Sequence, residues 1–514
     1  MNRKEALRQL KLGSSVAESD DDLQDYFVET ESFRSLIHGD GDIVAGDKGT
    51  GKSAIFKILA QQWANIPELE RVFVVPAFNT GGDPVFQQLA EGEVLTEGQY
   101  RTIWKTYVLS LGGNALLQEY KNWPSSLVKL DALLTRLNLR EPDYKPATIF
   151  SKLVKLIRRL LKPKSVGVAT SFDEAGLPVL TPQMEFGDGE SKEESEQTVI
   201  RHAESLGLLN DALRDKDLWL WLVLDRLDEA FTGYPHTETP ALRALFRTYL
   251  DLAEFDRIKL KMFVRKDLFR KVTQGGFVNL THINAKKIEI VWDDNDLLNL
   301  LIRRVKSNAD FVNTAQLQGK SNSEVFYSLF PDQVEEGSRR PKTLDWMLSR
   351  IRDGNNVKPP RNLIELVTKA REEQLRAEDR EEAQEFDLTG VLIKSEAIKN
   401  ALTRLSKDRV DDTLVAESGE YQQYIEKFRD GKAEHNLDSI RKTLELADTD
   451  TSTVLRILLD MGFLERTGDT YKIPMLYRDG LNITQGKAFQ PEIFSDEAMA
   501  ALKEQLDRDS KNKS

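Results

Sequence analysis

A glycine-rich stretch near the N-terminus has the residue types of a phosphate-binding loop. The pattern G-x-x-x-x-G-K-[ST] is matched at each fixed position by Gly46, Asp47, Lys48, Gly49, Thr50, Gly51, Lys52 and Ser53, with Ala54 next. Glycines let such a loop point its backbone N–H groups inward, and the positive end of the following helix adds to the field. We expect Lys52 to contact the β- and γ-phosphates of a nucleotide and Ser53 to ligate Mg²⁺. The alternatives are an ordinary flexible loop and, for Lys48, a solvated side chain.

A group of acidic residues lies far downstream, where an apolar run ends. Residues 218–224 are almost entirely apolar; Asp225 follows them, and Asp228 and Glu229 come three and four positions later. A carboxylate at the end of a buried strand can hold magnesium directly or through water, the role we assign to Asp225. A second carboxylate there can orient and deprotonate the attacking water, and we favour Glu229 over Asp228 as this base. The alternative is that DRLDE is only an acidic helix N-terminus.

Several arginines could respond to the terminal phosphate. Arg265 directly follows the apolar run 258–264, at the edge where neighbouring strands deliver catalytic groups, although an ion pair with a nearby acid is an alternative. Arg361, after Pro359-Pro360 at the start of a helix, could reach the nucleotide from a helical subdomain. The remaining arginines are two weaker candidates, Arg350 and Arg352, and two that we expect on a solvated helical face, Arg303 and Arg304.

These side chains can meet only if strands carry them to one edge of a sheet. A short apolar run at 43–45 precedes the loop, and helical periodicity follows it. Further strands are expected within 71–78, 218–231, 258–269 and 286–292, mostly as the near-continuous apolar runs typical of a parallel sheet buried on both faces. The pattern predicts an α/β fold with helices flanking a parallel sheet. An insertion at about 97–205 is expected to hold helices, a basic amphipathic helix at 148–164, a hairpin around 173–178 and an acidic loop.

Six ordered blocks of the sequence resemble a family of largely uncharacterised bacterial P-loop ATPases, which is similar to the STAND and AAA+ groups. The blocks, within residues 11–370, are LKLGSSVAESDDDLQDYFVETESFRSLI, GDKGTGKSAIF, LVLDRLDEAF, KMFVRKDLF, KIEIVWDDNDLLNLLIRRV and DGNNVKPPRNLIEL. The resemblance implies a P-loop core with an additional strand and a catalytic glutamate (the ASCE type) and a helical lid with a second arginine sensor. The corresponding residues are Lys52, Ser53, Asp225, Glu229, Arg265 and Arg361.

The resemblance also has a point of departure and suggests a biological setting. We call the expected strand at 218–224, which ends at Asp225, the acid-tipped strand. Related STAND proteins usually carry a small residue directly after this first acid, whereas this chain has Arg226. Relatives of this kind often occur in bacterial defence, including antiviral defence, or in stress responses. We therefore expect such a setting for this chain.

The composition limits the class of protein. A chain of 514 residues is longer than one domain, and 40% hydrophobic residues are enough for real cores. The net charge of -12 argues against a surface coated with basic groups for nucleic acid, although it allows a local basic patch. The absence of cysteine excludes disulfides and thiolate chemistry. No secretory leader and no apolar run of membrane-spanning length is found, so we expect a cytoplasmic protein with no membrane partner.

Three parts are expected along the chain. Residues 1–295 would form the ATPase core with its insertion, 296–375 a helical lid, and 376–514 a C-terminal domain with a frayed tail. The nearly all-charged stretch 370–386 is interpreted as a solvated helix or a linker at the second boundary. The C-terminal part resembles a winged-helix domain, because the stretch from residue 452 begins as a helix and continues as two short strands with a turn at 467–470.

Two uses of bound ATP and Mg²⁺ remain open. In the first, ATP draws core and lid together and the C-terminal domain reports the change to a protein partner or effector, and we expect the protein to be a homo-oligomer. In the second, the winged helix grips DNA in an ATP-dependent machine. The candidate recognition helix has few basic residues among several acids, so nucleic acid is not favoured; those residues are Arg456, Arg466, Asp448, Asp450 and Asp460. The pair Asp225 and Glu229 argues against a third reading, a scaffold that binds nucleotide without hydrolysing it.

Overall fold

The structure is a computed structural model that describes most of the chain. The described residues are 3–77, 95–120, 123–142, 148–149, 152–153, 170–172, 178–180, 202–227, 235–274, 276–380, 390–415 and 419–488. The chain divides into two compact units, each made of more than one stretch of sequence. Unit 1 comprises Met1–Leu7, Phe326–Lys358 and Glu365–Ser514, and unit 2 comprises Arg8–Val325 and Pro359–Ile364. Residues 296–375, expected as a single lid, are therefore shared between the two units.

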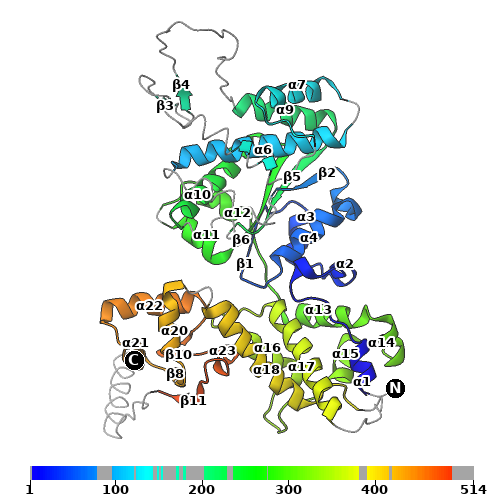
Figure 1. Ribbon diagram of the computed structural model, residues 1–514, viewed down its shortest axis with the longest axis vertical. Coiled ribbons are helices and arrows are strands. Elements are labelled where there is room, and N and C mark those ends of the chain that lie inside the picture. Colours follow the sequence, from blue (N-terminus) through cyan, green and yellow to red (C-terminus); the bar gives the residue numbers. More distant parts are fainter. Residues whose placement is uncertain are drawn as a thin grey trace, which may run out of the picture. The chain divides into compact units, whose positions relative to one another are not determined.

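A parallel sheet built from the predicted apolar runs forms the centre of unit 2. Its strands are β1 (Ile43–Gly46), β2 (Val72–Pro76), β5 (Trp219–Leu224), β6 (Ile258–Arg265) and β7 (Lys287–Glu289), in the order β2-β5-β6-β1-β7. Each neighbouring pair is parallel, so the carboxyl ends of the strands share one edge. Strand β6 stands between the loop strand β1 and the acid-tipped strand β5 (Figure 1). This is the additional strand implied by the resemblance, and the predicted α/β P-loop fold is confirmed.

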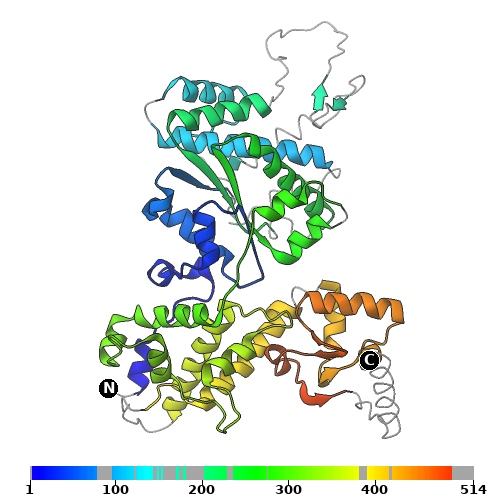
Figure 2. The same cartoon turned by 180° about the vertical axis from the view of Figure 1, so that it is seen from behind.

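Two sets of helices cover the two faces of this sheet. The larger core joins the strands to α6 (Glu97–Glu119), α7 (Ser125–Arg136), α9 (His202–Asp215), α10 (Pro235–Asp251), α11 (Lys266–Thr273) and α12 (Leu280–Ala285). The other core joins them to α3 (Glu31–Ile37) and α4 (Lys52–Gln62). Figure 2 shows α3 and α4 in blue and α10 and α11 in green on opposite sides of the strands. Side chains of β5 alternate between the cores, Leu220 and Leu222 entering the first and Trp221 and Val223 the second.

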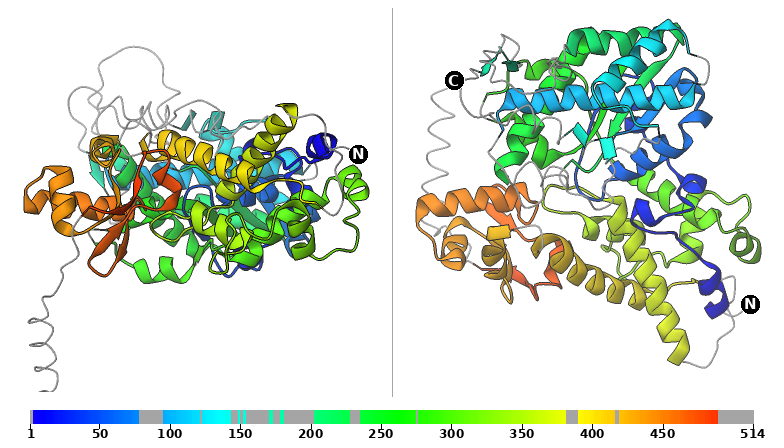
Figure 3. Two further views of the ribbon diagram at one scale, coloured as in Figure 1. Left: turned by 90° about the horizontal axis from the view of Figure 1, so that it is seen from below. Right: turned by 45° about the horizontal axis from the view of Figure 1, so that its top comes forward.

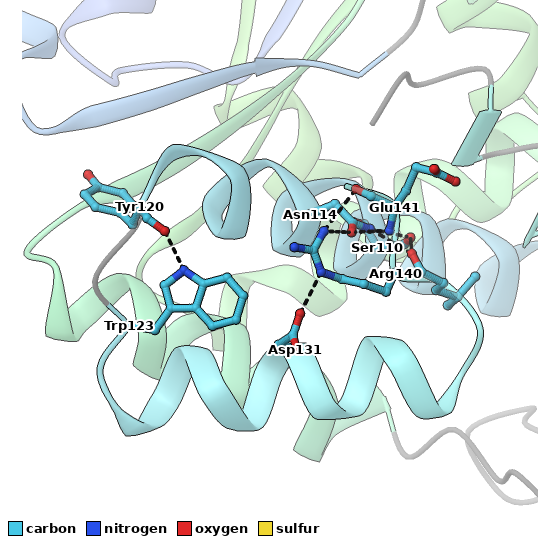
Figure 4. Close-up of polar contacts among 8 residues, drawn as sticks. Ser110, Asn114, Tyr120, Trp123, Asp131, Arg140 and Glu141 are labelled. Atoms are coloured by element: carbon cyan, nitrogen blue, oxygen red, sulfur yellow. Dashed lines mark hydrogen bonds and ion pairs between the residues drawn. The ribbon is translucent and has the colours of Figure 1, made fainter. Parts of the chain in front are cut away.

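A buried amide fixes the segment that follows α7 against α6. Asn114, fully buried in that helix, donates through Nδ2 to the backbone carbonyl of Leu139 at 2.8 Å. Its Oδ1 accepts from the Arg140 guanidinium (3.1 Å) and from the Glu141 backbone N–H (2.7 Å), while Arg140 also pairs with Asp131 at 2.6 Å (Figure 4). The chain leaving α7 is therefore held by satisfied polar contacts rather than by apolar packing alone. None of the helices in the described ranges, α6 included, combines the length and apolar character that crossing a membrane requires.

The rest of the insertion is described only in part. Strands β3 (Thr170–Phe172) and β4 (Pro178–Leu180) pair antiparallel, which confirms the predicted hairpin. Of the expected basic helix at 148–164, only four residues lie in the described part of the chain, and all four are helical. The acidic loop at 181–200 lies outside the described residues.

The boundary expected between residues 375 and 376 falls inside a helix. Unit 1 includes α15 (Asn322–Leu329) from Phe326 on, α16 (Thr343–Ile351), most of α17 (Pro360–Arg380) and α18 (Ser395–Arg409). The charged end of α17 is neither a linker nor fully solvated, because Gln374 and Glu378 are buried. Glu378 accepts from Gln374 at 2.8 Å and pairs with Arg3 of α1 (Arg3–Gln9) at 3.2 Å. Paired charges of this kind can enter a protein interior, which composition alone did not reveal.

The C-terminal part of unit 1 contains the predicted helix and hairpin. Four strands form a sheet in the order β11-β8-β10-β9; they are β8 (Lys432–His435), β9 (Glu465–Thr467), β10 (Thr470–Lys472) and β11 (Thr484–Lys487). Three helices accompany the sheet, namely α20 (Gln422–Glu426), α21 (Leu437–Leu444) and α22 (Asp448–Asp460) (Figure 3). Strands β9 and β10 are antiparallel, with Thr467 opposite Thr470 across the predicted turn. The ring of Phe428 packs edge to face against those of His435 and Phe463.

The segment that precedes α3 is tied down by a buried ion pair. We call residues 11–26 the N-terminal strap. Arg304 of α13 (Asp294–Lys306) lies 2.9 Å from Asp20, and both side chains are almost inaccessible to solvent. The Arg304 guanidinium also donates to the backbone carbonyls of Leu12 and Ser14. The expectation that Arg304 belongs to a solvated helical face is therefore wrong, because the strap covers it.

Removal of the Arg304 charge should destabilise the protein strongly. Arg304→Met would leave the Asp20 carboxylate buried without its cation, a change that typically costs about 3–5 kcal/mol. The neighbouring Arg303, which is exposed and donates to the Phe27 carbonyl, provides the matched variant Arg303→Met. Urea denaturation followed by circular dichroism should show a much larger loss for Arg304→Met than for Arg303→Met. Equal losses would mean that the strap is not held by this pair.

Candidate nucleotide-binding site

The phosphate loop connects β1 directly to α4. The strand ends at Gly46 and the helix begins at Lys52, so five residues make the turn. Gly49 and Gly51 have φ values of 75° and 101°, in the left-handed region that favours glycine. Gly51 is the N-cap of α4 and supplies no side-chain cap, so the N–H groups of the first helical turn point toward the loop without intrahelical acceptors. An anion is the natural partner of such a helix start.

Two side chains of the loop hold it closed on itself. The Lys52 ammonium donates to the carbonyls of Gly46 (3.0 Å) and Asp47 (2.9 Å), and the Thr50 hydroxyl donates to the Asp47 carbonyl (2.7 Å). Lys52 thus lies over the loop as the motif predicts. These two acceptors are neutral carbonyls, and a phosphate oxygen with a formal charge forms a stronger hydrogen bond to an ammonium group. The contacts position Lys52 for phosphate rather than block the loop.

The loop and the acid-tipped strand meet at Ser53 and Asp225. Their side chains lie close enough for the Ser53 hydroxyl to oppose the rise in the pKa of the Asp225 carboxyl, although 171 residues lie between them in the sequence. Asp225 is 4% exposed; burial raises its pKa to about 6, against the opposing effects of the Ser53 hydroxyl, the Arg226 backbone N–H and the Lys52 charge. A hydroxyl beside a carboxylate offers the oxygen ligands that Mg²⁺ prefers, and this ion keeps several waters rather than needing a complete protein cage. The pair therefore fits magnesium.

Arg265 reaches the predicted edge, but a neighbouring acid holds its side chain. It lies opposite Gly46 in the β1–β6 ladder. Its guanidinium contacts Asp267 through two nitrogens, at 3.1 and 2.8 Å, which is the ion pair left open as an alternative. Lys266, the next residue, lies 3.4 Å from Asp47 of the phosphate loop and 3.2 Å from Glu289. Burial opposes its charge, but these two carboxylates hold the pKa of Lys266 above its usual range.

Arg361 lies against the phosphate loop within unit 2. Its backbone N–H is 3.5 Å from the Gly49 carbonyl. A Cβ at position 49 would lie 3.2 Å from Cβ of Arg361 and 3.4 Å from Cβ of Pro359. The φ angle of Gly49 favours glycine, and the close approach of Arg361 and Pro359 leaves little room for a side chain there. The structure brings the candidate sensor Arg361 to the site.

A tryptophan that the sequence did not single out supports the other side of the loop. The Trp292 indole N–H donates to the Thr50 carbonyl at 2.8 Å. The ring also packs against an apolar group made of Val28, Leu300 and Ile364. A spacing rule could have found Lys266, because it follows a buried strand at the catalytic edge. No comparable signal marks Trp292, which follows the short strand β7.

The structure describes some of the remaining predicted residues, and two of them lie outside the described part of the chain. Asp228 and Glu229 lie outside the described residues, so their roles stay predictions. Lys48 is exposed, and Ala54 lies in the first turn of α4. Arg350 and Arg352 belong to unit 1. Arg350 pairs with Glu335 at 3.6 Å and Arg352 with Glu465 at 3.2 Å, both also in unit 1.

Comparison with known proteins gives matches of low sequence identity. No protein-family model matches it. The transposon gamma-delta 80.3 kDa protein of Escherichia coli K12 is 23% identical over 303 residues, which are 57% of this chain and 39% of that protein. The chain therefore spans about two fifths of the length of this curated relative.

Solved structures with similar chains have low sequence identity. The ORC2 protein of Aeropyrum pernix, in its ADPNP–ADP complexes, gives a TM-score of 0.40 at 12% identity over 91% of this chain and 92% of that chain. A Walker-type ATPase of Pyrococcus abyssi gives 0.40 at 12% identity over 92% and 100%. The Aeropyrum pernix ORC1 protein in complex with DNA gives 0.35 at 12% identity over 95% and 98%.

The buried carboxylate should make stability depend on pH. The pKa of Asp225 is raised, so the folded state holds this proton more firmly than the unfolded state does. Its contribution to stability is full below about pH 4 and is lost as the pH rises through about 6. The rise corresponds to at most about 3 kcal/mol. In the nucleotide-free protein, Asp225→Asn should therefore raise the melting temperature at pH 8, and the gain should shrink toward pH 4.5.

Thermal denaturation across this pH range tests the prediction. Asp211→Asn, at an exposed position of α9, provides the control for loss of one negative charge and should change little at either pH. A gain for Asp225→Asn that persists undiminished at low pH would contradict the assignment.

Proposed function

We propose that this chain binds ATP with Mg²⁺ and hydrolyses it. The observation that carries the proposal is the position of the buried Asp225 carboxylate beside the Ser53 hydroxyl, because it brings the acid-tipped strand to the phosphate loop. A glycine-rich loop that binds only a structural anion has no need of a buried acid beside its serine. The cost of burying Asp225 is most simply explained by a cation that it holds.

Each residue of the loop has a definite part in this function. Lys52 exchanges its carbonyl partners for β- and γ-phosphate oxygens, and the N–H groups at the start of α4 contact the same phosphates. Ser53 and Asp225 hold the metal ion. Magnesium, when bound, neutralises charge on the phosphates and favours attack on the terminal one. Glu229 orients and deprotonates the attacking water, with Asp228 as the alternative base.

Arginines complete the proposed site from two directions. Arg361 senses the terminal phosphate from the start of α17, next to Gly49. Arg265 contacts the same phosphate once its ion pair with Asp267 has broken. A neighbouring subunit could supply a further arginine if the protein assembles as a homo-oligomer.

The proposed output is a conformational switch that acts on a protein partner, in a setting of bacterial defence or stress response. The C-terminal part supports a winged-helix assignment, because α20, β8, α21, α22, β9 and β10 follow one another in the order helix, strand, helix, helix, strand, strand. Its second helix pairs Arg441 with Asp448 of α22 at 3.1 Å, and α22 itself carries acids at both ends. Such a helix is poorly suited to phosphates, so we favour a protein contact over DNA.

Two variants separate binding from hydrolysis. Lys52→Ala should weaken nucleotide binding by at least about tenfold, since a hydrogen bond to a charged group contributes about 1.5–3 kcal/mol. Glu229→Gln should keep binding but slow phosphate release by roughly 100-fold or more. Calorimetry and a phosphate-release assay provide the two measurements. Lys129→Ala, at an exposed position of α7, is the matched control for loss of a lysine. If Lys52→Ala and Glu229→Gln both bind and hydrolyse ATP like the wild type, the proposal is wrong.

The proposed partner and the oligomeric state are tested by adding duplex DNA and ATP separately. With duplex DNA, turnover is expected to stay unchanged at low and high salt. ATP is expected to shift the mass in size-exclusion chromatography with light scattering toward a defined oligomer. Strong stimulation by DNA that fades with salt would favour the alternative function, an ATP-dependent DNA-binding machine.

A further inference from the structure

A cavity of about 490 Å³ lies at the edge of the sheet opposite the phosphate loop. Its walls include Val72 and Trp219, the first residues of β2 and β5, and Lys259 near the start of β6. Because the strands are parallel, their starts share one edge, whereas the phosphate loop follows the end of β1 at the other. The volume is within the range of about 300–1,000 Å³ that is usual for small-molecule sites. The cavity is therefore a candidate binding site separate from the nucleotide site.

The face of the sheet toward α3 and α4 changes from apolar to cationic at this edge. Phe263 of β6 is buried in the apolar core on that face. Side chains two positions apart in a strand share a face, so Lys261 and Lys259 precede Phe263 on it. Both lysines line the cavity, as do Trp219 and Trp221 of the neighbouring strand β5. The buried strand thus places two ammonium groups beside two indole rings.

Lys261 already has its counter-ion within the protein. It is 1% exposed, and its ammonium group donates to Oδ1 of Asp42 at 2.7 Å and to the Gly41 carbonyl at 2.8 Å. The other carboxylate oxygen of Asp42, Oδ2, accepts from the Tyr249 hydroxyl at 2.9 Å. Both oxygens of Asp42, the buried acid of the cavity lining, are therefore engaged.

Lys259 differs from the other cations of the lining. Arg71 pairs with Asp217 at 2.9 Å, and Lys286 donates to the Asp40 carbonyl at 3.3 Å. Lys259 is half-buried, yet within the described ranges no group accepts a hydrogen bond from it and no carboxylate lies within ion-pair distance. A charged group that is partly removed from water is stabilised by a partner of opposite charge. The position of Lys259 therefore favours an anion in the cavity.

Two further donors line the cavity without an acceptor. Neither the Trp219 nor the Trp221 indole N–H is hydrogen-bonded to any residue that the structure describes. An indole N–H can only donate, so it needs an oxygen or nitrogen acceptor. The lining also contains the acids Glu68 and Glu70, but both are exposed to solvent. The cavity thus offers one ammonium group and two neutral donors to a ligand that carries acceptor oxygens.

We propose that this cavity binds a small phosphate monoester with a ring-containing body, of the size of a mononucleotide. The Lys259 ammonium pairs with the phosphate group, and the two indole N–H groups donate to its other oxygens. A phosphate monoester fits better than a carboxylate, because it has three acceptor oxygens and a charge of about −1.5 to −2. Lys286 and Arg71 add positive charge at exposed positions, while Ile37 and Val72 provide apolar contacts for the body of the ligand.

Calorimetric titration of the full-length chain with AMP and with inorganic phosphate tests this proposal. The Lys52→Ala variant is the background, so that the phosphate loop does not contribute. AMP should bind saturably and more tightly than inorganic phosphate, because its body contacts the apolar part of the lining. Lys259→Met should weaken AMP binding by at least about tenfold, as expected for loss of a hydrogen bond to a charged group. Lys129→Met, at an exposed position of α7, is the matched control and should bind AMP normally.

A second variant keeps the test valid if Lys259→Met does not fold, which circular dichroism will show. Trp219→Phe removes one donor, retains an aromatic ring and should weaken AMP binding by roughly fivefold. With an intact phosphate loop, both cavity variants should bind a non-hydrolysable ATP analogue like the wild type. Absence of saturable AMP binding, AMP binding that the folded cavity variants do not weaken, equal affinity for inorganic phosphate and AMP, or an equal loss of the ATP analogue would each overturn the inference.

Discussion

The meeting of a serine hydroxyl with a buried carboxylate is the contact on which the rest of the site depends. It requires the ends of β1 and β5 to lie at one edge of the sheet with β6 between them, and the parallel order provides this. It also requires Asp225 to be buried, which raises its pKa. The apolar cores on both faces of the sheet hold that unfavourable arrangement, because the strands cannot shift without exposing residues such as Leu222 and Val223.

Charges around the phosphate loop are arranged in opposing pairs. Lys266 meets Asp47, Arg226 meets Glu18, and Arg265 meets Asp267. The acids keep the cations oriented at a site that would otherwise concentrate positive charge. Phosphates can then replace some of these partners without a large rearrangement of the backbone, which is the preorganisation that electrostatic catalysis needs.

Sequence patterns predicted the sheet and the core of the site, but missed what depends on packing between distant segments. The glycine spacing located Lys52 and Ser53, and an apolar run ending in an acid located Asp225, because both signals are local. The burial of Arg304 and the contact between Glu18 and Arg226 arise from the fold of the N-terminal strap, which has no periodic signal. The charged end of α17 was misread for a related reason, since only its partners show that Glu378 is buried.

The chain passes between the two units four times, at Leu7, Val325, Lys358 and Ile364. Only six residues, Pro359–Ile364, make up the return to unit 2, yet they bring Pro359 and Arg361 against Gly49 and add Ile364 to the group around Trp292. No single cut in the polypeptide can therefore release a self-contained nucleotide-binding half. A truncation after residue 325 would retain the phosphate loop and the acid-tipped strand and still lack Pro359 and Arg361, which lie against the loop.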